Sequence, residues 1–201
     1  EDVQNKRQFS KISNFGFPGG LQPPGLVDYA KGYGITIDLA FSRQLYANWL
    51  AHYPEVKNYF GVIKALSGGY GMGSTVKHHR TGFVRGNVSF TEAANHEFQH
   101  LTATGFKAAL WDVTKECYIN EKSQLFGSRP VLAIHDEIIS EVPIERAHEA
   151  GQRQSELMIS AMQPWTPDVP VVVEPALMTR WIKGARSVYD SKGKLVLYEK
   201  V

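Results

Sequence analysis

Residues 130–143 read PVLAIHDEIISEVP. Two short apolar runs, Val131–Ile134 and Ile138–Ile139, flank the charged triplet His135–Glu137. Apolar runs of this length between prolines predict two short buried strands, with the triplet at the turn between them. Carboxylates rarely lie between buried strands unless they are paired or hold a metal. We therefore expect a hairpin over 131–142. Its acidic turn has two interpretations, a metal site or a solvated surface turn.

The composition restricts the class of protein but not its partners. The chain has 201 residues, of which 43% are hydrophobic, enough for one sizeable core. The net charge of +2 is small, so any nucleic-acid surface must be local. The single cysteine, Cys117, excludes an internal disulfide and indicates a reducing compartment. The start, EDVQ, suggests a chain cut from something larger. No apolar segment is long enough for a signal or a membrane span, so we expect an intracellular, cytoplasmic protein without membrane contact.

Periodicity and punctuation predict a mainly helical chain with a few strands. Helices are expected over 3–17, 26–31, from a cap at 36–38 to about 52, over 54–66, from a Thr91 cap to about 118, and over 145–162. A strand is expected over 169–174, and a C-terminal hairpin should turn at residues 191–193.

The first helix carries a candidate nucleotide-binding face. Arg7, Lys11 and Phe15 lie four residues apart and so share one side of the helix. Two cations followed by an aromatic ring suit a triphosphate with a base stacked beyond it. The alternative is a solvated basic face beside a core phenylalanine.

Residues 67–87 are rich in glycine and in basic residues. Phosphates could be met by Lys77, His78, His79, Arg80 and Arg85. From this set we expect Lys77 and Arg80 to contact DNA. The alternative is a flexible surface loop, and the glycine spacing matches no nucleotide-binding fingerprint.

The long helix contains the literal motif H-E-x-x-H, from His96 through Glu97 to His100. On a helix this motif places two imidazoles on one face beside a glutamate, as zinc peptidases require. The extended form of the motif fails, because Ala103 and Phe106 replace its glycine and third histidine. Glu116 or Glu121 could still supply a third ligand, so a zinc peptidase stays open as an alternative function.

A second interpretation uses more of the chain. The helix RQFSKISNFG, with Arg7, Lys11, Phe15 and Gly16, resembles the fingers helix of family A DNA polymerases, the class of bacterial DNA polymerase I and phage replicases. The triplet at 135–137 resembles the V-H-D-E palm hairpin of that family.

Further matches follow in the same order along the chain. Asn95, Gln99 and Lys107 resemble the N-x-x-x-Q…K helix that contacts the primer–template. The segment DVPVVVEP at 168–175 and the pair at 180–181 resemble the closing strand and C-terminal residues of the family. The resemblance covers residues 5–183, and four ordered matches outweigh one five-residue motif.

The resemblance implies a role for each matching residue. The implied roles are phosphate neutralisation by Arg7 and Lys11, packing near the sugar and base by Phe15, catalytic Mg²⁺ ligation by Asp136 with Glu137 adjacent, a place near the primer terminus for His135, and duplex contacts by Asn95 and Gln99. Carboxylate oxygens are the ligands that Mg²⁺ prefers, and two metals can stabilise the attacking and leaving oxygens of phosphoryl transfer.

Three departures from the family pattern qualify this expectation. Gly19 stands where the family carries a tyrosine, and Thr91 stands where an arginine is common. The first palm motif, D-x-S-x-I-E, which supplies a second metal-binding aspartate, is missing from the sequence. We therefore expect this chain to be inactive alone and to need an N-terminal polymerase portion that carries the motif.

The resulting prediction is an α+β fold, mainly helical with a small antiparallel palm sheet, an incomplete fingers and palm. Fingers helices are expected over 1–66, the C-terminal part of the palm over 67–183, and a hairpin tail over 184–201. The expected partners are primer–template DNA, a dNTP and the N-terminal portion, with Mg²⁺ as cofactor. A non-catalytic DNA-binding fragment is the remaining alternative.

Overall fold

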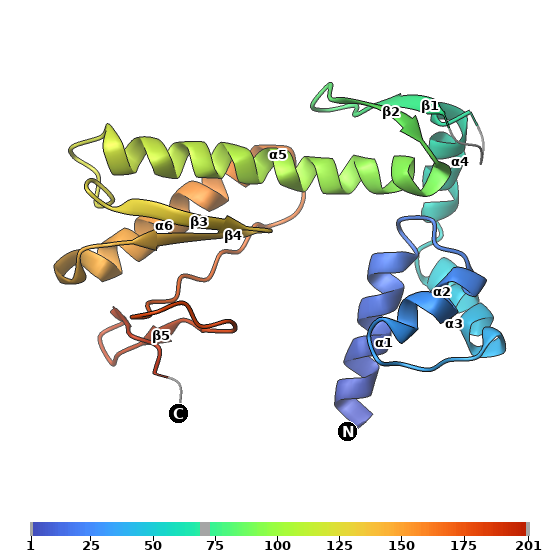
Figure 1. The fold of residues 1–201 in the computed structure, drawn as a ribbon, viewed down its shortest axis with the longest axis horizontal. Helices are drawn as coiled ribbons and strands as arrows, with labels where there is room; N and C mark the ends of the chain where they lie inside the picture. Colours follow the sequence, from blue (N-terminus) through green and yellow to red (C-terminus); the bar gives the residue numbers. More distant parts are fainter. Residues whose placement is uncertain (1, 69–72, 200–201) are drawn as a thin grey trace. The chain divides into compact units, whose positions relative to one another are not determined.

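The computed structural model describes residues 2–68 and 73–199, with side chains from Arg7 onward. It divides into two compact units, Glu1–Leu101 and Thr102–Val201, whose boundary falls inside helix α5. The main elements are α1 (Asp2–Gly16), α2 (Pro23–Lys31), α3 (Leu39–His52), α4 (Val56–Leu66), β1 (Ser74–Lys77), β2 (Val84–Val88), α5 (Phe90–Tyr118), β3 (Arg129–Ile134), β4 (Glu137–Glu141), α6 (Ala147–Met162), β5 (Val188–Tyr189) and β6 (Leu195–Val196) (Figure 1). Short 3₁₀ turns, η1 (Ile144–Arg146) and η2 (Gln163–Trp165), flank α6. The predicted α+β class, mainly helical with small antiparallel sheets, is confirmed.

Helices α1 to α3 form the first compact group of unit 1. Their buried side chains make one apolar cluster, which contains Ile12, Phe17, Leu26, Ala30, Ile37 and Trp49. Helix α3 begins at a side-chain cap, because the Asp38 carboxylate accepts a hydrogen bond of 2.7 Å from the Phe41 backbone N–H. Packing of this group fixes which face of α1 is exposed.

The second group of unit 1 joins α4, a β-hairpin and the start of α5. The segment 67–87, for which a flexible loop was one expectation, contains the antiparallel pair β1–β2, although its residues 69–72 lie outside the described residues. The hairpin forms because Val76 and Val88 bury their side chains against Ile63 and Phe90. Gly82, at φ 71°, lies in the turn between the strands, where a left-handed conformation favours glycine.

Helix α5 begins at Phe90 and is capped by Ser89, so the predicted cap at Thr91 is wrong. The Glu92 carboxylate accepts hydrogen bonds of 2.9 Å from the Ser89 backbone N–H and from its hydroxyl group. The Ser89 hydroxyl in turn accepts one of 3.3 Å from the Glu92 N–H. This reciprocal arrangement is a capping box of S-x-x-E form. Across the described residues, no helix combines the length and apolarity that a membrane span requires.

Unit 2 packs the β3–β4 hairpin and the later part of α5 against α6. Its core contains Ala109, Val113 and Cys117 of α5, Leu125, Ile138 of β4, and Ala150 and Ala161 of α6. The predicted hairpin is confirmed, since β3 and β4 pair antiparallel. The prediction that both strands are buried is wrong, because Val131 and Leu132 of β3 are about half exposed. Within the described residues the sheet has two strands, and no third strand covers β3.

The C-terminal segment also differs from the prediction. Residues 169–174 form no strand, and Val172 is 77% exposed, because this β-branched run has no described strand to pair with. The predicted C-terminal hairpin is confirmed as β5–β6. Gly193, at φ 75°, lies in its turn, where the Asp190 carboxylate accepts hydrogen bonds from the Lys192 and Lys194 backbone N–H groups.

Candidate functional site

The acidic triplet occupies the turn of the β3–β4 hairpin. Ile134 pairs with Glu137, so His135 and Asp136 form a two-residue turn. His135 has φ 53°, a left-handed conformation that histidine adopts more readily than most residues with a side chain. All three side chains of the triplet are exposed. The short loop therefore presents Asp136 to solvent on a backbone that the strand pairing restricts.

Helix α6 anchors this hairpin through one side chain. The Gln154 amide donates a hydrogen bond of 2.8 Å to the Ile138 carbonyl and accepts one of 2.7 Å from the Ser140 hydroxyl. The Ile138 side chain, 6% exposed, lies in the core between α5 and α6. These contacts begin two residues beyond Asp136, so they fix the position of the turn.

The turn offers carboxylate oxygens that are not paired with any described cation. Among the described residues, neither the Asp136 nor the Glu137 carboxylate has an ion pair. Exposed, unpaired carboxylates are suitable ligands for a hard cation such as Mg²⁺. In the described part of the chain, no histidine, cysteine or acidic residue joins Asp136 and Glu137 as a third ligand. The donor set therefore fits part of a magnesium site.

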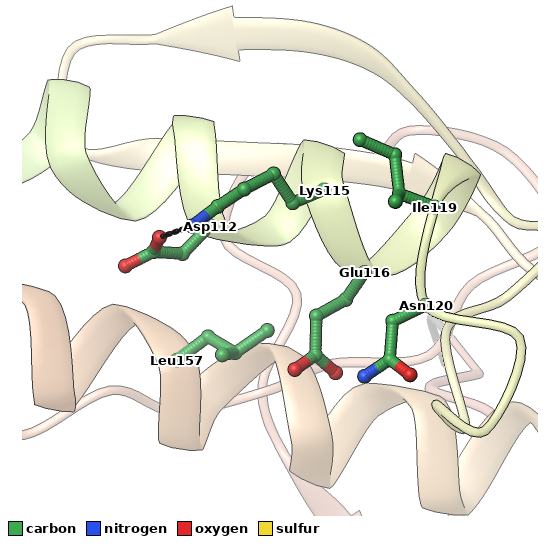
Figure 2. A pocket seen from close by; sticks show the side chains of 6 residues that line it. All are labelled: Asp112, Lys115, Glu116, Ile119, Asn120 and Leu157. Atoms are coloured by element: carbon green, nitrogen blue, oxygen red, sulfur yellow. Dashed lines mark ion pairs between the residues drawn. The ribbon is translucent and has the colours of Figure 1, made fainter.

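A groove of about 1150 Å³ lies beside the hairpin within unit 2. Its walls come from β4, α6, residues 172–185 and residues 194–197, and they include Asp136 and Glu137. A smaller pocket of about 290 Å³ lies between α5 and α6 (Figure 2). Its charges are already paired, since Asp112 contacts Lys115 at 2.8 Å and Glu116 binds Arg153. The groove, and not the smaller pocket, is therefore the candidate for function.

Glu116 shows how a carboxylate is held by the fold in this unit. It accepts hydrogen bonds from the Arg153 guanidinium at 2.6 and 2.9 Å and from the Ser123 hydroxyl. The Arg153 bonds, helped by Ser123, lower the pKa of Glu116 to about 2. This pair stabilises the contact between α5 and α6.

The predicted nucleotide-binding residues lie on one exposed face of α1. Arg7 and Lys11 are exposed, and Phe15 is 62% exposed, while the intervening Ile12 is buried in the helical core. The exposure of Phe15 excludes the alternative in which this ring belongs to the core. Two cations and a ring are therefore available to a ligand on this face.

The predicted DNA-binding pair Asn95 and Gln99 also lies in unit 1. The Gln99 amide donates a hydrogen bond of 3.3 Å to the Asn95 carbonyl oxygen, and the Asn95 amide donates one of 2.9 Å to the Thr91 carbonyl. A Cβ atom at Gly19 would lie only 2.5 Å from Asn95 Nδ2. Gly19 thus leaves the space that the Asn95 side chain occupies.

The basic residues of the β1–β2 hairpin differ in availability. Lys77 and Arg80 are exposed. Arg85 is engaged by Glu92 at 2.9 Å. His78 is fully buried, so the expectation that it could meet a phosphate is wrong.

The hydrogen bonds of His78 fix its tautomer. Its Nδ1 accepts hydrogen bonds from the Arg80 and Thr81 backbone N–H groups at 3.2 and 3.1 Å. The ring proton must therefore be on Nε2, which donates to the Glu97 carbonyl at 2.7 Å. Both ring nitrogens are used, so His78 is a structural residue that fastens the hairpin to α5.

The H-E-x-x-H helix does not assemble the metal site that the motif predicts. The His96 and His100 rings stack with centroids 5.2 Å apart, and Glu97 binds His79 at 2.7 Å. In the described part of the chain, the one group with metal-ligand spacing is His78, His79 and Glu97. Because His78 Nε2 carries a proton, only two ligands remain, fewer than a zinc site needs. We therefore do not retain the zinc-peptidase alternative.

Sequence reasoning missed two positioning residues. Gln154 anchors the acidic hairpin, but an amide 16 residues from its partner leaves no sequence signal. Ser89 was recognisable, because Ser89 and Glu92 have the capping-box spacing at the start of an amphipathic helix.

Comparison with known proteins identifies the family of this chain. The model of "DNA polymerase family A" matches residues 1–183, so the β5–β6 tail lies beyond the match. The chain is 29% identical to DNA polymerase I of Aquifex aeolicus over 186 residues, which cover 91% of this chain and 31% of the relative. It is 30% identical to DNA polymerase I of Lactococcus lactis subsp. lactis over 173 residues, covering 81% of this chain and 19% of the relative.

A third relative, DNA polymerase I of Chloroflexus aurantiacus, is 27% identical over 188 residues, covering 89% of this chain and 18% of the relative. The chain therefore spans less than a third of the length of these curated relatives. A family match over most of its length nonetheless decides its classification: the chain belongs to DNA polymerase family A.

Proposed function

We propose that this chain is the C-terminal catalytic portion of a template-directed DNA polymerase that transfers a nucleotide to a primer 3′-OH. The observation that carries the proposal is the exposed Asp136–Glu137 pair, held at a short hairpin turn in a chain of this family. The DNA polymerase I relatives support the same activity. On this proposal the protein works in the cytoplasm on primer–template DNA and a dNTP.

The α1 face binds the incoming nucleotide in this proposal. Arg7 and Lys11 neutralise the triphosphate, and Phe15 packs near the sugar and base. The support is their common exposure on one side of a helix whose opposite side is buried. Positioning and charge neutralisation are the main requirements of phosphoryl transfer, and this face supplies both.

The hairpin turn holds the metal in this proposal. Asp136 is the Mg²⁺ ligand, and Glu137 is adjacent. Bound Mg²⁺ ions supply charge stabilisation at the attacking and leaving oxygens. The protein's own contribution is the restricted turn, which the Gln154 hydrogen bonds and the buried Ile138 keep in place.

We propose that a second acidic ligand comes from an additional polymerase portion, since no further acidic group joins the hairpin turn among the described residues. Asp136 and Glu137 alone provide too few ligands for a metal pair. Within the described residues β3 pairs only with β4, so its other edge is open to an additional palm strand. We propose that an N-terminal polymerase portion with the D-x-S-x-I-E motif supplies both, and that the present chain is inactive alone.

The remaining predicted residues contact DNA in this proposal. The contacts are made by Asn95 and Gln99 on α5, by His135 at the turn, and by Lys77 and Arg80 on the β1–β2 hairpin. Residues 1–66 act as fingers, and 67–183 as the C-terminal part of the palm. Exposed cations suit phosphates, and amide side chains suit polar groups in the grooves.

Primer extension with Mg²⁺ and four dNTPs tests the proposal. One reaction contains this chain alone, and a second contains this chain with a fragment that carries the D-x-S-x-I-E motif. We expect extension only in the mixture, and loss of extension when the chain carries Asp136→Ala. The fragment alone is the control.

Two outcomes would contradict this function. Extension at a normal rate by the chain alone would overturn the requirement for an N-terminal portion. If neither reaction extends the primer, while salt-dependent duplex binding survives Asp136→Ala, the chain is a non-catalytic DNA-binding portion.

A further inference from the structure

The Lys11 ammonium on α1 lies over an aromatic ring. Its Nζ is 5.5 Å from the centroid of the Tyr33 ring, within the range of a cation–π contact. Among the described side chains, no carboxylate forms an ion pair with Lys11. The positive charge of Lys11 is therefore held in place by the ring and is not neutralised by any described carboxylate.

Tyr33 is itself fixed by the end of α2. Its backbone N–H donates a hydrogen bond of 2.9 Å to the Ala30 carbonyl, and Ala30 is buried in the helical core. The Tyr29 and Tyr33 hydroxyl groups share a hydrogen bond of 3.1 Å, and the two rings meet edge to face at 5.2 Å. Tyr33 nevertheless stays 39% exposed. Tyr29 therefore contacts one part of the ring, and the rest is accessible.

Tyr29 supports this arrangement as a neutral phenol. Its hydrogen bond with Tyr33, together with burial, raises the pKa of Tyr29 to about 12. At neutral pH Tyr29 therefore places no negative charge near Lys11.

A neutral ring and a carboxylate would have opposite effects on phosphate binding. A carboxylate beside Lys11 would orient the ammonium but would also repel a triphosphate. The ring restricts the long lysine side chain and leaves its N–H donors available for phosphate oxygens. Ordering Lys11 in advance lowers the entropy lost on binding.

We propose that Tyr33 is a positioning residue for Lys11, which orders the ammonium for the triphosphate of the incoming nucleotide. The inference rests on the proposed function, since it takes Lys11 as a phosphate ligand. It adds a residue from the turn after α2 to the triphosphate site. Tyr33 acts through Lys11 and has no contact of its own with the nucleotide in this proposal.

Nucleotide binding by the full 201-residue chain tests this inference. Isothermal titration with dTTP and with dTMP, both with Mg²⁺, compares the wild type with Lys11→Ala, Tyr33→Leu, Tyr33→Phe and Tyr29→Phe. We expect Lys11→Ala to weaken dTTP binding by at least about tenfold. Tyr33→Leu should weaken dTTP binding roughly two- to fivefold, the range of an exposed cation–π contact, and leave dTMP binding unchanged.

The phenylalanine variants separate positioning from packing. Tyr33→Phe keeps the ring face and should bind dTTP like the wild type. Tyr29→Phe breaks the same hydroxyl hydrogen bond while both rings remain, so it should also bind like the wild type. If Tyr33→Phe weakens binding as much as Tyr33→Leu, the hydroxyl bond and not the ring matters, and the inference is overturned.

The Lys11→Ala variant distinguishes a failure of the inference about Tyr33 from a failure of the assignment of Lys11 as a phosphate ligand. If Lys11→Ala weakens dTTP binding but Tyr33→Leu does not, Tyr33 has no positioning role and the proposed function stands. If Lys11→Ala has no effect on dTTP binding, the assignment of Lys11 fails and the inference fails with it. Thermal unfolding of each variant verifies that it is folded.

Discussion

Two regions of this protein carry histidine and acidic residues in motifs that suggest catalysis, and they differ in how the fold uses those side chains. In the β1–β2 and α5 region, His78 is buried with both ring nitrogens hydrogen-bonded, and Glu97 is engaged by His79. In the β3–β4 turn, Asp136 and Glu137 are exposed, and no described ion pair holds them. The first region uses His78 and Glu97 for structure. The second leaves Asp136 and Glu137 available.

This difference is more informative than the motifs themselves. H-E-x-x-H is a longer and better-known pattern than H-D-E, yet its glutamate is occupied and its two histidine rings stack on each other. A catalytic site needs polar groups that the fold holds in position but does not engage in hydrogen bonds or ion pairs of its own. By that criterion the hairpin turn is the candidate for metal chemistry, and the His96-Glu97-x-x-His100 motif itself is part of the scaffold.

The largest expected effect is a difference in primer extension between variants of Asp136 and of Glu97. In the mixture with the D-x-S-x-I-E fragment, Asp136→Asn should reduce primer extension by at least roughly a hundredfold, because metal binding contributes several kcal/mol to the transition state. The matched variant Glu97→Gln should retain extension within about threefold of the wild type, since the Glu97 carboxylate is engaged by His79. The initial rate of extension measures both. Equal losses in the two variants would remove the distinction between the regions.

The next effect separates two adjacent histidines by stability. His78→Leu should lower the free energy of unfolding by about 3 kcal/mol, because two backbone N–H groups and one carbonyl lose their buried partner. His79→Leu is the matched control and should cost less than about 1 kcal/mol, since the side chain is 68% exposed. Urea unfolding at pH 7 gives both values. A small loss for His78→Leu would contradict its structural role.

Glu116 provides the same contrast among carboxylates, now as a function of pH. Glu116→Gln should lower the free energy of unfolding by about 2 kcal/mol at pH 7, because it removes a bidentate pair with Arg153. The pKa of Glu116 is about 2 in the folded protein against an ordinary 4.5. The stabilisation is therefore complete above pH 4.5 and is lost as the pH falls toward 2.

Urea unfolding at pH 7 and at pH 3 measures this change. The difference between wild type and Glu116→Gln should be smaller at pH 3 than at pH 7. Glu137→Gln is the control, and its free energy of unfolding should match that of the wild type at pH 7 because no described ion pair holds Glu137. A constant difference for Glu116→Gln at both pH values would show that the Arg153 pair does not lower the pKa of Glu116.

Local patterns in the sequence predicted most of the helices and the hairpin. The period of α1 placed Arg7, Lys11 and Phe15 on one face, and prolines delimited the β3–β4 strands. Pairing across long stretches could not be predicted in this way. The run at 169–174 has high β propensity but forms no strand, since a strand also needs a neighbour.

The candidate site was predictable where its residues adjoin one another in the sequence. Asp136 and Glu137 are consecutive, so a motif could identify them. The commitment of His78 to backbone groups on both sides, the Gln154 anchor of the hairpin and the approach of Asn95 to Gly19 depend on three-dimensional packing. Sequence reasoning therefore identified the acidic pair. It did not identify the residues that hold the hairpin in place, or the histidines whose ring nitrogens are hydrogen-bonded within the fold.

The smallest expected effect concerns His96, the first residue of H-E-x-x-H. Its side chain is 4% exposed, and its Nε2 has no hydrogen-bond partner among the described residues. Replacing a buried polar atom that lacks a partner with an apolar ring removes a desolvation cost, so His96→Phe should change the free energy of unfolding by less than about 1 kcal/mol, or stabilise the protein. The Phe ring also keeps the aromatic contacts with Phe83 and His100.

Urea unfolding of His96→Phe beside His78→Leu tests this prediction directly, because the His78 and His96 rings lie 5.8 Å apart in the same cluster. A loss of several kcal/mol, accompanied by stoichiometric zinc in the dialysed wild type but not in His96→Phe, would mean that His96 Nε2 has a metal as its partner, and the contrast between the two regions would then be wrong.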